Sequence, residues 1–434
     1  MKRPASAGPT ASAEAAIGKI APARLAAFEI LTLVGEGKGH SDELLHSPRM
    51  EALSPEDRNL TTALVMGVLR WQIALDARVR GLLQRPEQRL AEPVALALRL
   101  GAFQLLHLDR IPAHAALGES VELCRAAGEP HATGMVNAVL RKLAAAQKPG
   151  QRVFESVAAF SERLGHPQWL VERWVAAYGR EAALKVCEAD QKEPVDGALF
   201  RESGGDLPQM DDGSRLVAEL AAAAMPTART VWECCAAPGG KTLILAHRLK
   251  SAEITATDIS AKRLAQAQAR FRRYAYAEEI HCAVADATAP GDERFDLILC
   301  DVPCSGTGTL AGNPEIRHRL KPEEFTRQSA RQRAILSAAI KRLAPGGRLV
   351  YSTCSLEPEE CELVVEGIIA GANIKRIPVE NLIQKLAESD VLREGANLAS
   401  AARDSILRTL PGTQSCDGFF AAVFERDESD PQSA

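Results

Sequence analysis

Apolar residues in the first third of the chain recur at steps of three and four, the spacing of one helix face. Leu60, Leu64 and Val68 follow this spacing. Before them, Ser54-Pro55-Glu56-Asp57 has the N-cap serine, first-turn proline and first-turn acids of a helix start. No alternating, strand-like pattern interrupts these helices, so we predict an all-α domain over residues 19–147. Residues 1–18 are rich in Ala, Ser, Gly and Pro, and we expect them to be disordered.

From residue 214 onward, short apolar runs alternate with helical stretches. This alternation predicts an α/β domain over 214–427, with a parallel sheet and helices on both faces. A last apolar run, 418–424, predicts an edge strand with 405–410 as its partner. Residues 148–213 are expected to form a helical linker between the domains. The predicted parallel strands are Thr230–Cys234, Ile254–Thr257, Ile280–Val284, Asp296–Cys300 and Arg348–Thr353.

Composition places the chain among globular proteins of several domains. It has 434 residues, of which 46% are hydrophobic and 25% charged. The sequence contains no run of about 18 apolar residues, so we predict no membrane-spanning helix. The N-terminus lacks the apolar core of a secretory signal. We therefore expect a cytoplasmic protein without a membrane partner, with its 10 cysteines mostly reduced.

The net charge of −4 argues against a strongly basic nucleic-acid-binding protein. The charge is unevenly distributed, however, because residues 301–350 carry nine Lys or Arg against four Asp or Glu. A second basic run lies over 262–273. Such clusters form phosphate-binding faces even on acidic proteins, although charge runs are more often solvated helix surfaces.

The first candidate for chemistry is the segment Cys234-Cys-Ala-Ala-Pro-Gly-Gly-Lys-Thr242, directly after the first predicted strand. A turn of small residues there lets backbone N–H groups approach a ligand at the carboxyl end of a sheet. The segment matches neither a dinucleotide G-x-G-x-x-G motif nor a P-loop, whose first glycine would fall at Cys235. Binding of ATP or NAD is therefore disfavoured.

Acidic residues end three successive predicted strands: Asp258, Asp286 and Asp301. In such folds an acid at the second strand accepts hydrogen bonds from ribose hydroxyls, and Asp286 is expected near an adenine amino group. Three acids along one sheet edge predict a nucleoside cofactor such as S-adenosyl-L-methionine.

Two cysteines follow predicted strands in Asp301-Val-Pro-Cys304-Ser-Gly-Thr-Gly308 and Tyr351-Ser-Thr-Cys354-Ser. Both are expected to open into the crevice beside Asp301. They suit a redox pair, a metal site or a nucleophile with a helper. No further ligand has the spacing of a zinc site, so we expect no metal.

Together these residues resemble the NOL1/NOP2/Sun family of RNA cytosine-C5 methyltransferases. The helical half is similar to the antitermination-factor NusB domain. The resemblance implies an α/β Rossmann-like methyltransferase domain preceded by an all-α NusB-like, RNA-binding domain. The methyltransferase matches are Cys235–Lys241, Asp301–Gly306, Asn313–Arg317, Leu343–Gly347, Tyr351–Ser355, Glu357–Glu360 and Asp417–Phe420. The NusB-like matches are Asp57-Arg58, Gly67–Arg70, Leu100–Leu106, Arg110–His114 and Val136–Arg141.

The resemblance also implies roles. A thiolate that adds to C6 of cytosine activates C5 toward a methyl donor, which is covalent catalysis. Cys354 is the implied nucleophile, Cys304 assists breakdown of the adduct, and Asp301 hydrogen-bonds the base. The implied cofactor-binding residues are Cys235, Ala236, Ala237, Pro238, Gly239, Gly240, Lys241, Asp258, Asp286 and Asp301.

The implied substrate is an unpaired or flipped-out cytosine in RNA, with 16S rRNA or a precursor of the small ribosomal subunit as the expected partner of a monomeric chain. Arg317 and Arg319 are then expected to contact phosphates. Family members carry an RNA-recognition subdomain before the Asp211-Asp212-Gly213-Ser214 segment. Here that subdomain is truncated within residues 148–213. Two alternatives are a degenerate NusB-like protein of ribosome assembly and a DNA cytosine-C5 methyltransferase, in which the Pro-Cys cysteine attacks.

Overall fold

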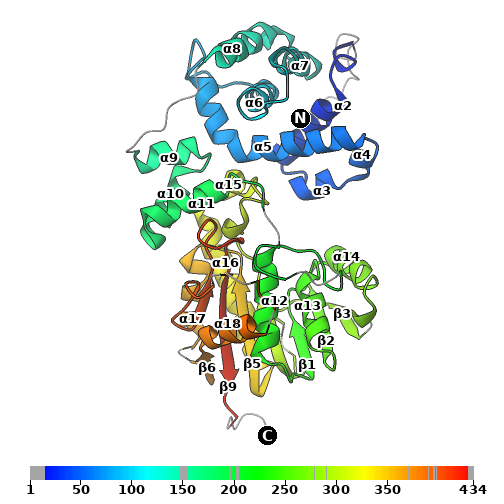
Figure 1. The fold of residues 1–434 in the computed structure, drawn as a ribbon, viewed down its shortest axis with the longest axis vertical. Helices are drawn as coiled ribbons and strands as arrows, with labels where there is room; N and C mark the ends of the chain where they lie inside the picture. Colours follow the sequence, from blue (N-terminus) through cyan, green and yellow to red (C-terminus); the bar gives the residue numbers. More distant parts are fainter. Residues whose placement is uncertain are drawn as a thin grey trace, which may run out of the picture. The chain divides into compact units, whose positions relative to one another are not determined.

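The computed structural model describes residues 15–146, 155–194, 197–201, 205–277, 279–289, 291–369, 371–389, 391–393, 396 and 398–428. The chain divides into two compact units. The first comprises residues up to Arg173 together with Asn313–His318, and the second comprises Trp174–Gly312 and the residues from Arg319 onward. Figure 1 shows helices alone in the first unit and a sheet flanked by helices in the second.

The first unit is a helical bundle, as the apolar spacing predicts. Its core joins α2, α5, α6, α7 and α8 through buried Leu, Val and Ala side chains. The predicted helix start is present, because Ser54 is the N-cap of α5 and its hydroxyl accepts the Asp57 N–H at 3.1 Å. The elements are α2 (Pro22–Gly35), α3 (Ser41–Leu45), α4 (Pro48–Glu51), α5 (Pro55–Arg80), α6 (Glu92–His107), α7 (Ala113–Ala126), η1 (Pro130–Ala132), α8 (Thr133–Ala145) and α9 (Val157–Arg163).

Two of the expected segments, the disordered N-terminus and the linker, lie only partly within the residues that the structure describes. Residues 15–17 are helical and Ala16 is 1% exposed, so this part of the segment expected to be disordered is folded. Residues 1–14 and residues 148–154, the start of the expected linker 148–213, lie outside the described residues. The division between the units falls at 173/174, within α10 (Gln168–Tyr178).

The segment Asn313–His318 folds as part of the helical unit, although it comes from the middle of the α/β sequence. Glu315 is 3% exposed and its carboxylate accepts the N–H and hydroxyl of Ser41 at 3.2 and 2.9 Å. Arg317 is 1% exposed and donates to the carbonyl oxygens of Arg70 and Gly165 at 3.3 and 3.2 Å. The expectation that Arg317 contacts RNA phosphates is therefore wrong: its guanidinium is used inside the protein.

We predict that Arg317→Ala lowers the free energy of unfolding by about 2–3 kcal/mol, because it leaves buried carbonyl groups without their charged donor. Urea denaturation measures this loss. Arg327→Ala is the matched control, since the Arg327 side chain is 72% exposed. A variant as stable as the parent chain, with weaker and less salt-dependent RNA binding, would restore the phosphate role.

The second unit contains one nine-stranded sheet in the order β3-β2-β1-β4-β5-β9-β8-β7, with β6 also paired to β9. The strands are β1 (Thr230–Glu233), β2 (Glu253–Asp258), β3 (Ile280–Val284), β4 (Phe295–Asp301), β5 (Leu343–Thr353), β6 (Ile374–Ile377), β7 (Ala402–Arg403), β8 (Ile406–Arg408) and β9 (Phe420–Arg426). The helices are α11 (Arg180–Ala189), α12 (Asp212–Ala224), α13 (Gly240–Arg248), α14 (Ala261–Phe271), η2 (Ala275–Ala277), η3 (Thr307–Thr309), α16 (Pro322–Lys341), η4 (Pro358–Glu360), α17 (Glu362–Ile369) and α18 (Val379–Glu388). The short helix α15 (Ile316–Arg319) belongs to the first unit except for Arg319.

Alternate residues along the central strands face opposite layers. Val231, Leu297 and Val350 pack with residues of α12, α13 and α18. Ile298 and Tyr351 lie on the other face, among residues of α16 and α17. All five strands from β1 to β5 pair in parallel, which confirms the predicted Rossmann-like architecture. Among the described helices, none has the length and apolar character that crossing a membrane requires.

The C-terminal strand differs from the prediction of an edge position. β9 pairs antiparallel with β5 on one side and with β8 and β6 on the other. Its central residues Phe420–Phe424 are all buried. A strand covered on both faces is apolar throughout, as this run is. The predicted partner is present, because β8 lies within the predicted 405–410 segment.

Candidate active site

The two cysteine loops meet at the carboxyl ends of β4 and β5. Asp301 at the end of β4 is paired with Ser352 near the end of β5, so the residues beyond both strands emerge at the same sheet edge. Cys304 and Cys354 lie there with their sulfur atoms 3.3 Å apart. Both side chains are partly exposed. The structure thus brings together the two cysteines that the sequence singled out.

Glycine at position 308 is required by the packing of these loops. Gly308 N–H donates to the Cys354 carbonyl at 2.9 Å, and Gly418 N–H donates to the Gly308 carbonyl at 2.8 Å. A Cβ on Gly308 would lie 2.1 Å from the Gly418 oxygen and 2.9 Å from the Cys354 oxygen. Both are backbone atoms, which cannot rotate away as a side chain does.

We predict that Gly308→Ala lowers the free energy of unfolding by about 1–3 kcal/mol and displaces the Cys354 loop, because the added methyl overpacks backbone against backbone. Thermal denaturation and methyl-transfer activity measure the two effects. Gly118→Ala on α7 is the control, since a Cβ there meets nothing within 4 Å and alanine favours a helix. Equal stability of the two variants would contradict the close approach.

The small-residue turn after β1 leads into α13, and Lys241 connects this turn to Asp301. Lys241 Nζ lies 2.7 Å from Asp301 Oδ2 and donates to the Ser214 hydroxyl at 2.6 Å. The Ser352 hydroxyl donates to Asp301 Oδ1 at 2.8 Å. Burial lowers the pKa of Lys241, but the charge and hydrogen bond of Asp301 outweigh it and the net shift is upward. Lys241 therefore stays protonated, and its ammonium group holds the Asp301 side chain in place.

The other two strand-end acids lie in different environments. Asp258 is 4% exposed, and its carboxylate accepts the N–H groups of Ala237 and Ser260 at 3.2 and 2.8 Å. Asp286 is exposed and accepts the N–H and hydroxyl of Thr288 at 2.9 and 2.8 Å. The Thr288 hydrogen bonds lower the pKa of Asp286. Asp258 thus ties β2 to the turn, while Asp286 presents a carboxylate at the surface.

One cavity of about 330 Å³ gathers most of the predicted site, a size within the usual range of small-molecule sites. The predicted residues in its wall are Cys235, Ala237, Asp258, Asp286, Asp301, Cys304 and Cys354. Ala236, Pro238, Gly239, Gly240 and Lys241 belong to the turn but do not line the cavity.

The cavity wall also contains residues that the sequence analysis did not assign to a site. Ile259 is 56% exposed, and it lines the cavity together with Ile335 from α16. Arg263 lines the wall too and donates to the Ala237 carbonyl at 2.6 Å. Arg331 lines the wall as well. Arg263 on α14 and Arg331 on α16 belong to the two basic stretches noticed in the sequence, whereas Ile335 gave no such signal and only the fold brings it here.

A buried acid, Glu233, ends β1 next to this turn. Glu233 is 1% exposed and accepts the Thr242 hydroxyl. Burial raises the pKa of Glu233 to about 8. An acid whose pKa is higher in the folded than in the unfolded state contributes stability at low pH, and this contribution is lost as pH rises toward the folded pKa.

We predict that Glu233→Gln removes this pH dependence. Between pH 5.5 and pH 8.5 the stability of the variant relative to the parent chain should rise by at least about 1 kcal/mol, because only the parent must ionise a buried group. Urea denaturation at both pH values measures the change, and Glu253→Gln, at an exposed position, is the control. A difference that stays constant with pH would contradict the raised pKa.

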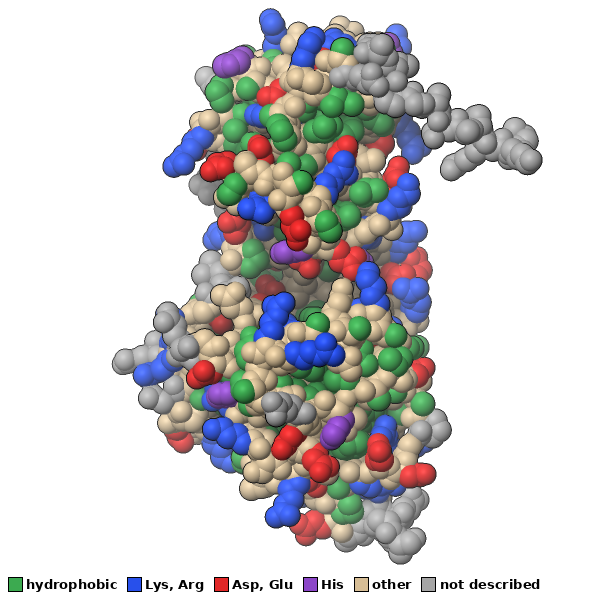
Figure 2. Space-filling view, turned by 90° about the vertical axis from the view of Figure 1, so that its right-hand side faces the viewer, with side chains coloured by type: hydrophobic (Ala, Val, Ile, Leu, Met, Phe, Trp, Pro, Cys, Tyr) green, Lys and Arg blue, Asp and Glu red, His purple; other side chains and the backbone are tan. Residues whose placement is uncertain are grey.

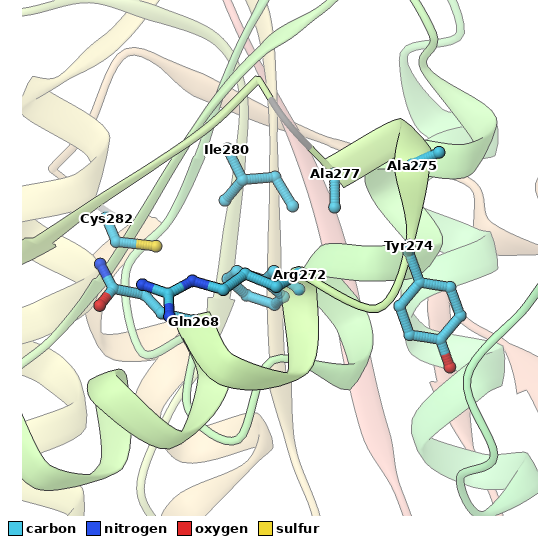
Figure 3. A pocket seen from close by; sticks show the side chains of 8 residues that line it. Gln268, Arg272, Tyr274, Ala275, Ala277, Ile280 and Cys282 are labelled. Carbon is cyan, nitrogen blue, oxygen red and sulfur yellow. The ribbon is translucent and has the colours of Figure 1, made fainter.

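A second cavity, of about 380 Å³, lies beside α14 and β3 and shares no lining residue with the first. Figure 3 shows Gln268 and Arg272 beside Cys282 and Ile280 in this cavity. Burial raises the pKa of Cys282, which opposes thiolate formation. None of the three strand-end acids lines this cavity. The chemistry is therefore concentrated in the first cavity.

Charges outside the site are mixed. On the face drawn in Figure 2, acidic and basic side chains are interspersed over both units. Within the part of the chain that the structure describes, no group of three or more His, Cys, Asp and Glu side chains is arranged to hold a metal ion.

A Rossmann-like sheet with a small-residue turn after β1 and acids at or after the ends of β2, β3 and β4 is typical of proteins that bind a nucleoside cofactor at the carboxyl ends of the strands. The RsmB/F family of 16S rRNA methyltransferases matches residues 222–425, and the NusB family matches residues 21–145. The chain belongs to the ribosomal RNA small subunit methyltransferase B family, because relatives of 30% and 32% identity match it over nearly its whole length. Membership confirms the expected enzyme class, a ribosomal RNA methyltransferase with S-adenosyl-L-methionine as its cofactor.

Two curated relatives span nearly the whole chain. Ribosomal RNA small subunit methyltransferase B of Xanthomonas campestris is 32% identical, covering 95% of this chain and 98% of that protein. The probable methyltransferase B of Bacillus subtilis is 30% identical, covering 91% and 96%. The crystal structure of PH0851 has the same fold, with a TM-score of 0.68 at 20% identity over 94% of this chain and 99% of that one.

Proposed function

We propose that the protein transfers a methyl group from S-adenosyl-L-methionine to C5 of a cytosine in 16S rRNA, through a covalent bond between Cys354 Sγ and C6 of the base. The observation that carries this proposal is the pair of thiols 3.3 Å apart beside a carboxylate held by a lysine. A degenerate binding protein would have no reason to keep this arrangement.

The cavity residues suit the cofactor. Asp258 and Asp286 offer carboxylates at neighbouring strand ends, where ribose hydroxyls and an adenine amino group find acceptors. Ile259 and Ile335 offer apolar surface for the flat base. When bound, S-adenosyl-L-methionine supplies an activated methyl group on a sulfonium. Catalysis beyond that falls to the side chains of the chain itself.

Cys354 performs the first step by adding as a thiolate to C6, which shifts electron density to C5 of the ring. C5 then takes the methyl group, with a neutral thioether as the leaving group. Transfer of the C5 proton to a base, together with departure of Cys354 from C6 as a thiolate, restores the aromatic cytosine. Asp301, fixed by Lys241 and Ser352, lies where it hydrogen-bonds the base and stabilises the charge that develops in the ring.

Cys304 suits the role of helper rather than of nucleophile. The hydrogen bond with Cys354, together with burial, raises the pKa of Cys304 well above its ordinary value. The thiolate is the attacking form of cysteine, so Cys304 remains protonated beside the Cys354 sulfur. In this position it assists breakdown of the adduct. This assignment opposes the DNA methyltransferase alternative, in which the Pro-Cys cysteine attacks.

The helical unit, as a NusB family domain, supplies further RNA contacts in this proposal. The cavity is small enough that the target cytosine must leave a stacked helix to enter it. We place the activity in the cytoplasm, on 16S rRNA or a small-subunit precursor, and in a monomeric chain.

The test uses tritiated S-adenosyl-L-methionine with 16S rRNA, small-subunit particles and duplex DNA. We expect label as 5-methylcytosine in ribosomal RNA only. Cys354→Ala should abolish labelling, because no nucleophile remains, whereas Cys304→Ala should accumulate RNA covalently bound to protein on denaturing gels. Cys416→Ala, a cysteine outside the cavity wall, is the matched control.

Other outcomes are equally informative. Attack by Cys304, seen as an adduct that Cys354→Ala retains, would contradict the assigned roles. Cofactor binding without label in any substrate would point to a different RNA. Absence of both would favour the binding-protein alternative.

A further inference from the structure

Each catalytic cysteine is followed by a serine, and both serines bind the same buried carboxylate. The Ser305 N–H donates to Glu360 Oε1 at 2.9 Å, and its hydroxyl donates to Oε2. The Ser355 hydroxyl donates to Glu360 Oε2 at 2.5 Å. Glu360 ends η4 and is 0% exposed. One side chain therefore connects the loop that carries Cys304 with the loop that carries Cys354.

Glu360 is itself held from two other elements. Gln332 on α16 donates its amide to Glu360 Oε1 at 3.1 Å and to the Pro303 carbonyl at 2.9 Å. The Tyr351 hydroxyl on β5 donates to the Glu360 carbonyl at 2.7 Å. Because α16 and β5 belong to the packed core, the carboxylate is a fixed point to which both loops are attached.

Burying the Glu360 carboxylate costs desolvation free energy. Burial raises the pKa of Glu360, although the hydrogen bonds of Ser305 and Ser355 oppose the shift. An apolar residue of similar size would avoid this cost. What an apolar residue lacks is directional, charge-assisted hydrogen bonding to two separate loops. The two serines that make these contacts directly follow Cys304 and Cys354 in the chain. Their position indicates that the buried carboxylate serves to position the two cysteines.

We propose that Glu360 is a positioning residue for methyl transfer: its carboxylate fixes the Cys304 and Cys354 sulfur atoms at the spacing that adduct breakdown needs. The role of this spacing in turnover rests on the proposed function. The distance between the two sulfur atoms does not rest on the proposed function, because it is a property of the protein without RNA or cofactor.

Glu360 also affects the protonation of Cys304. Its charge adds to the hydrogen bond with Cys354 and to burial in raising the pKa of Cys304. Glu360 thus helps to keep Cys304 in the thiol form while Cys354 acts as the nucleophile. Glu360 thus contributes to both the placement and the protonation of the helper cysteine, although it does not line the cavity.

The first experiment measures thiol spacing without RNA or cofactor. Diamide, a diazene oxidant, accepts two electrons and the two thiol protons, becomes a hydrazine, and leaves a Cys304–Cys354 disulfide. We expect this disulfide to form at least about tenfold more slowly in Glu360→Ala and Glu360→Gln than in the parent chain, because loosened loops align their sulfur atoms less often. Peptide mass mapping identifies the pair among the 10 cysteines.

Two further variants separate spacing from general damage. Glu366→Ala removes a charge from an exposed position on the neighbouring α17 and should leave the rate unchanged. Ser355→Ala removes one of the two loop contacts and should slow the reaction less than Glu360→Ala. Should Glu360→Ala fail to fold, Glu360→Gln carries the test, because it preserves size. Disulfide formation at the parent rate in folded Glu360→Gln would overturn the proposal.

The second experiment follows turnover. We expect Glu360→Gln to lower kcat at least about tenfold with little change in KM for RNA, and to accumulate covalent RNA as Cys304→Ala does. A residue that only stabilises the fold would lower activity without accumulating adduct, and that result would also overturn the proposal. If Cys354→Ala keeps methylating RNA, the proposed function fails, while the disulfide rates still report on Glu360.

Discussion

Parallel pairing of β4 with β5, in one register from Leu297 to Asp301, is the constraint on which the site depends. Asp301 lies opposite Ser352, so the chain leaves both strands at the same edge and Cys304 meets Cys354. A slip of one residue would turn the alternate residues of one strand to the wrong layer. The buried apolar residues on both faces of the sheet exclude such a slip. Leu297 and Val350 are buried on one face, and Ile298 and Tyr351 are buried on the other face. The core thereby fixes the distance between two thiols.

Buried polar groups, rather than surface charge, complete the arrangement. Lys241 holds Asp301, Glu360 holds the serines beside the cysteines, and Gly308 leaves room for backbone against backbone. Each buried group would be costly alone and is satisfied by several partners. The site is therefore preorganised by contacts made before any ligand binds, as electrostatic catalysis requires.

Arg317 shows why charge in a sequence is a weak guide to RNA binding. Within 301–350 it is one of nine basic residues, and nothing in its spacing separates it from its exposed neighbours. In the structure it is buried among carbonyl groups of the helical unit, with Glu315 bound to Ser41 close by. The segment Asn313–His318 is thus folded into the helical unit. Its placement comes from contacts with residues 152 to 274 positions away in the sequence.

The sequence alone determined the two-domain organisation, the five parallel strands, the strand-end acids and the two cysteines, because apolar periodicity and short motifs are local properties. It also carried the family resemblance and with it the proposed roles. Only the tertiary structure decided that β9 is interior, that Arg317 is buried, that Ile335 and Arg331 reach the cavity and that Glu360 joins the two loops. These properties depend on which distant residues meet, and local pattern contains no such information.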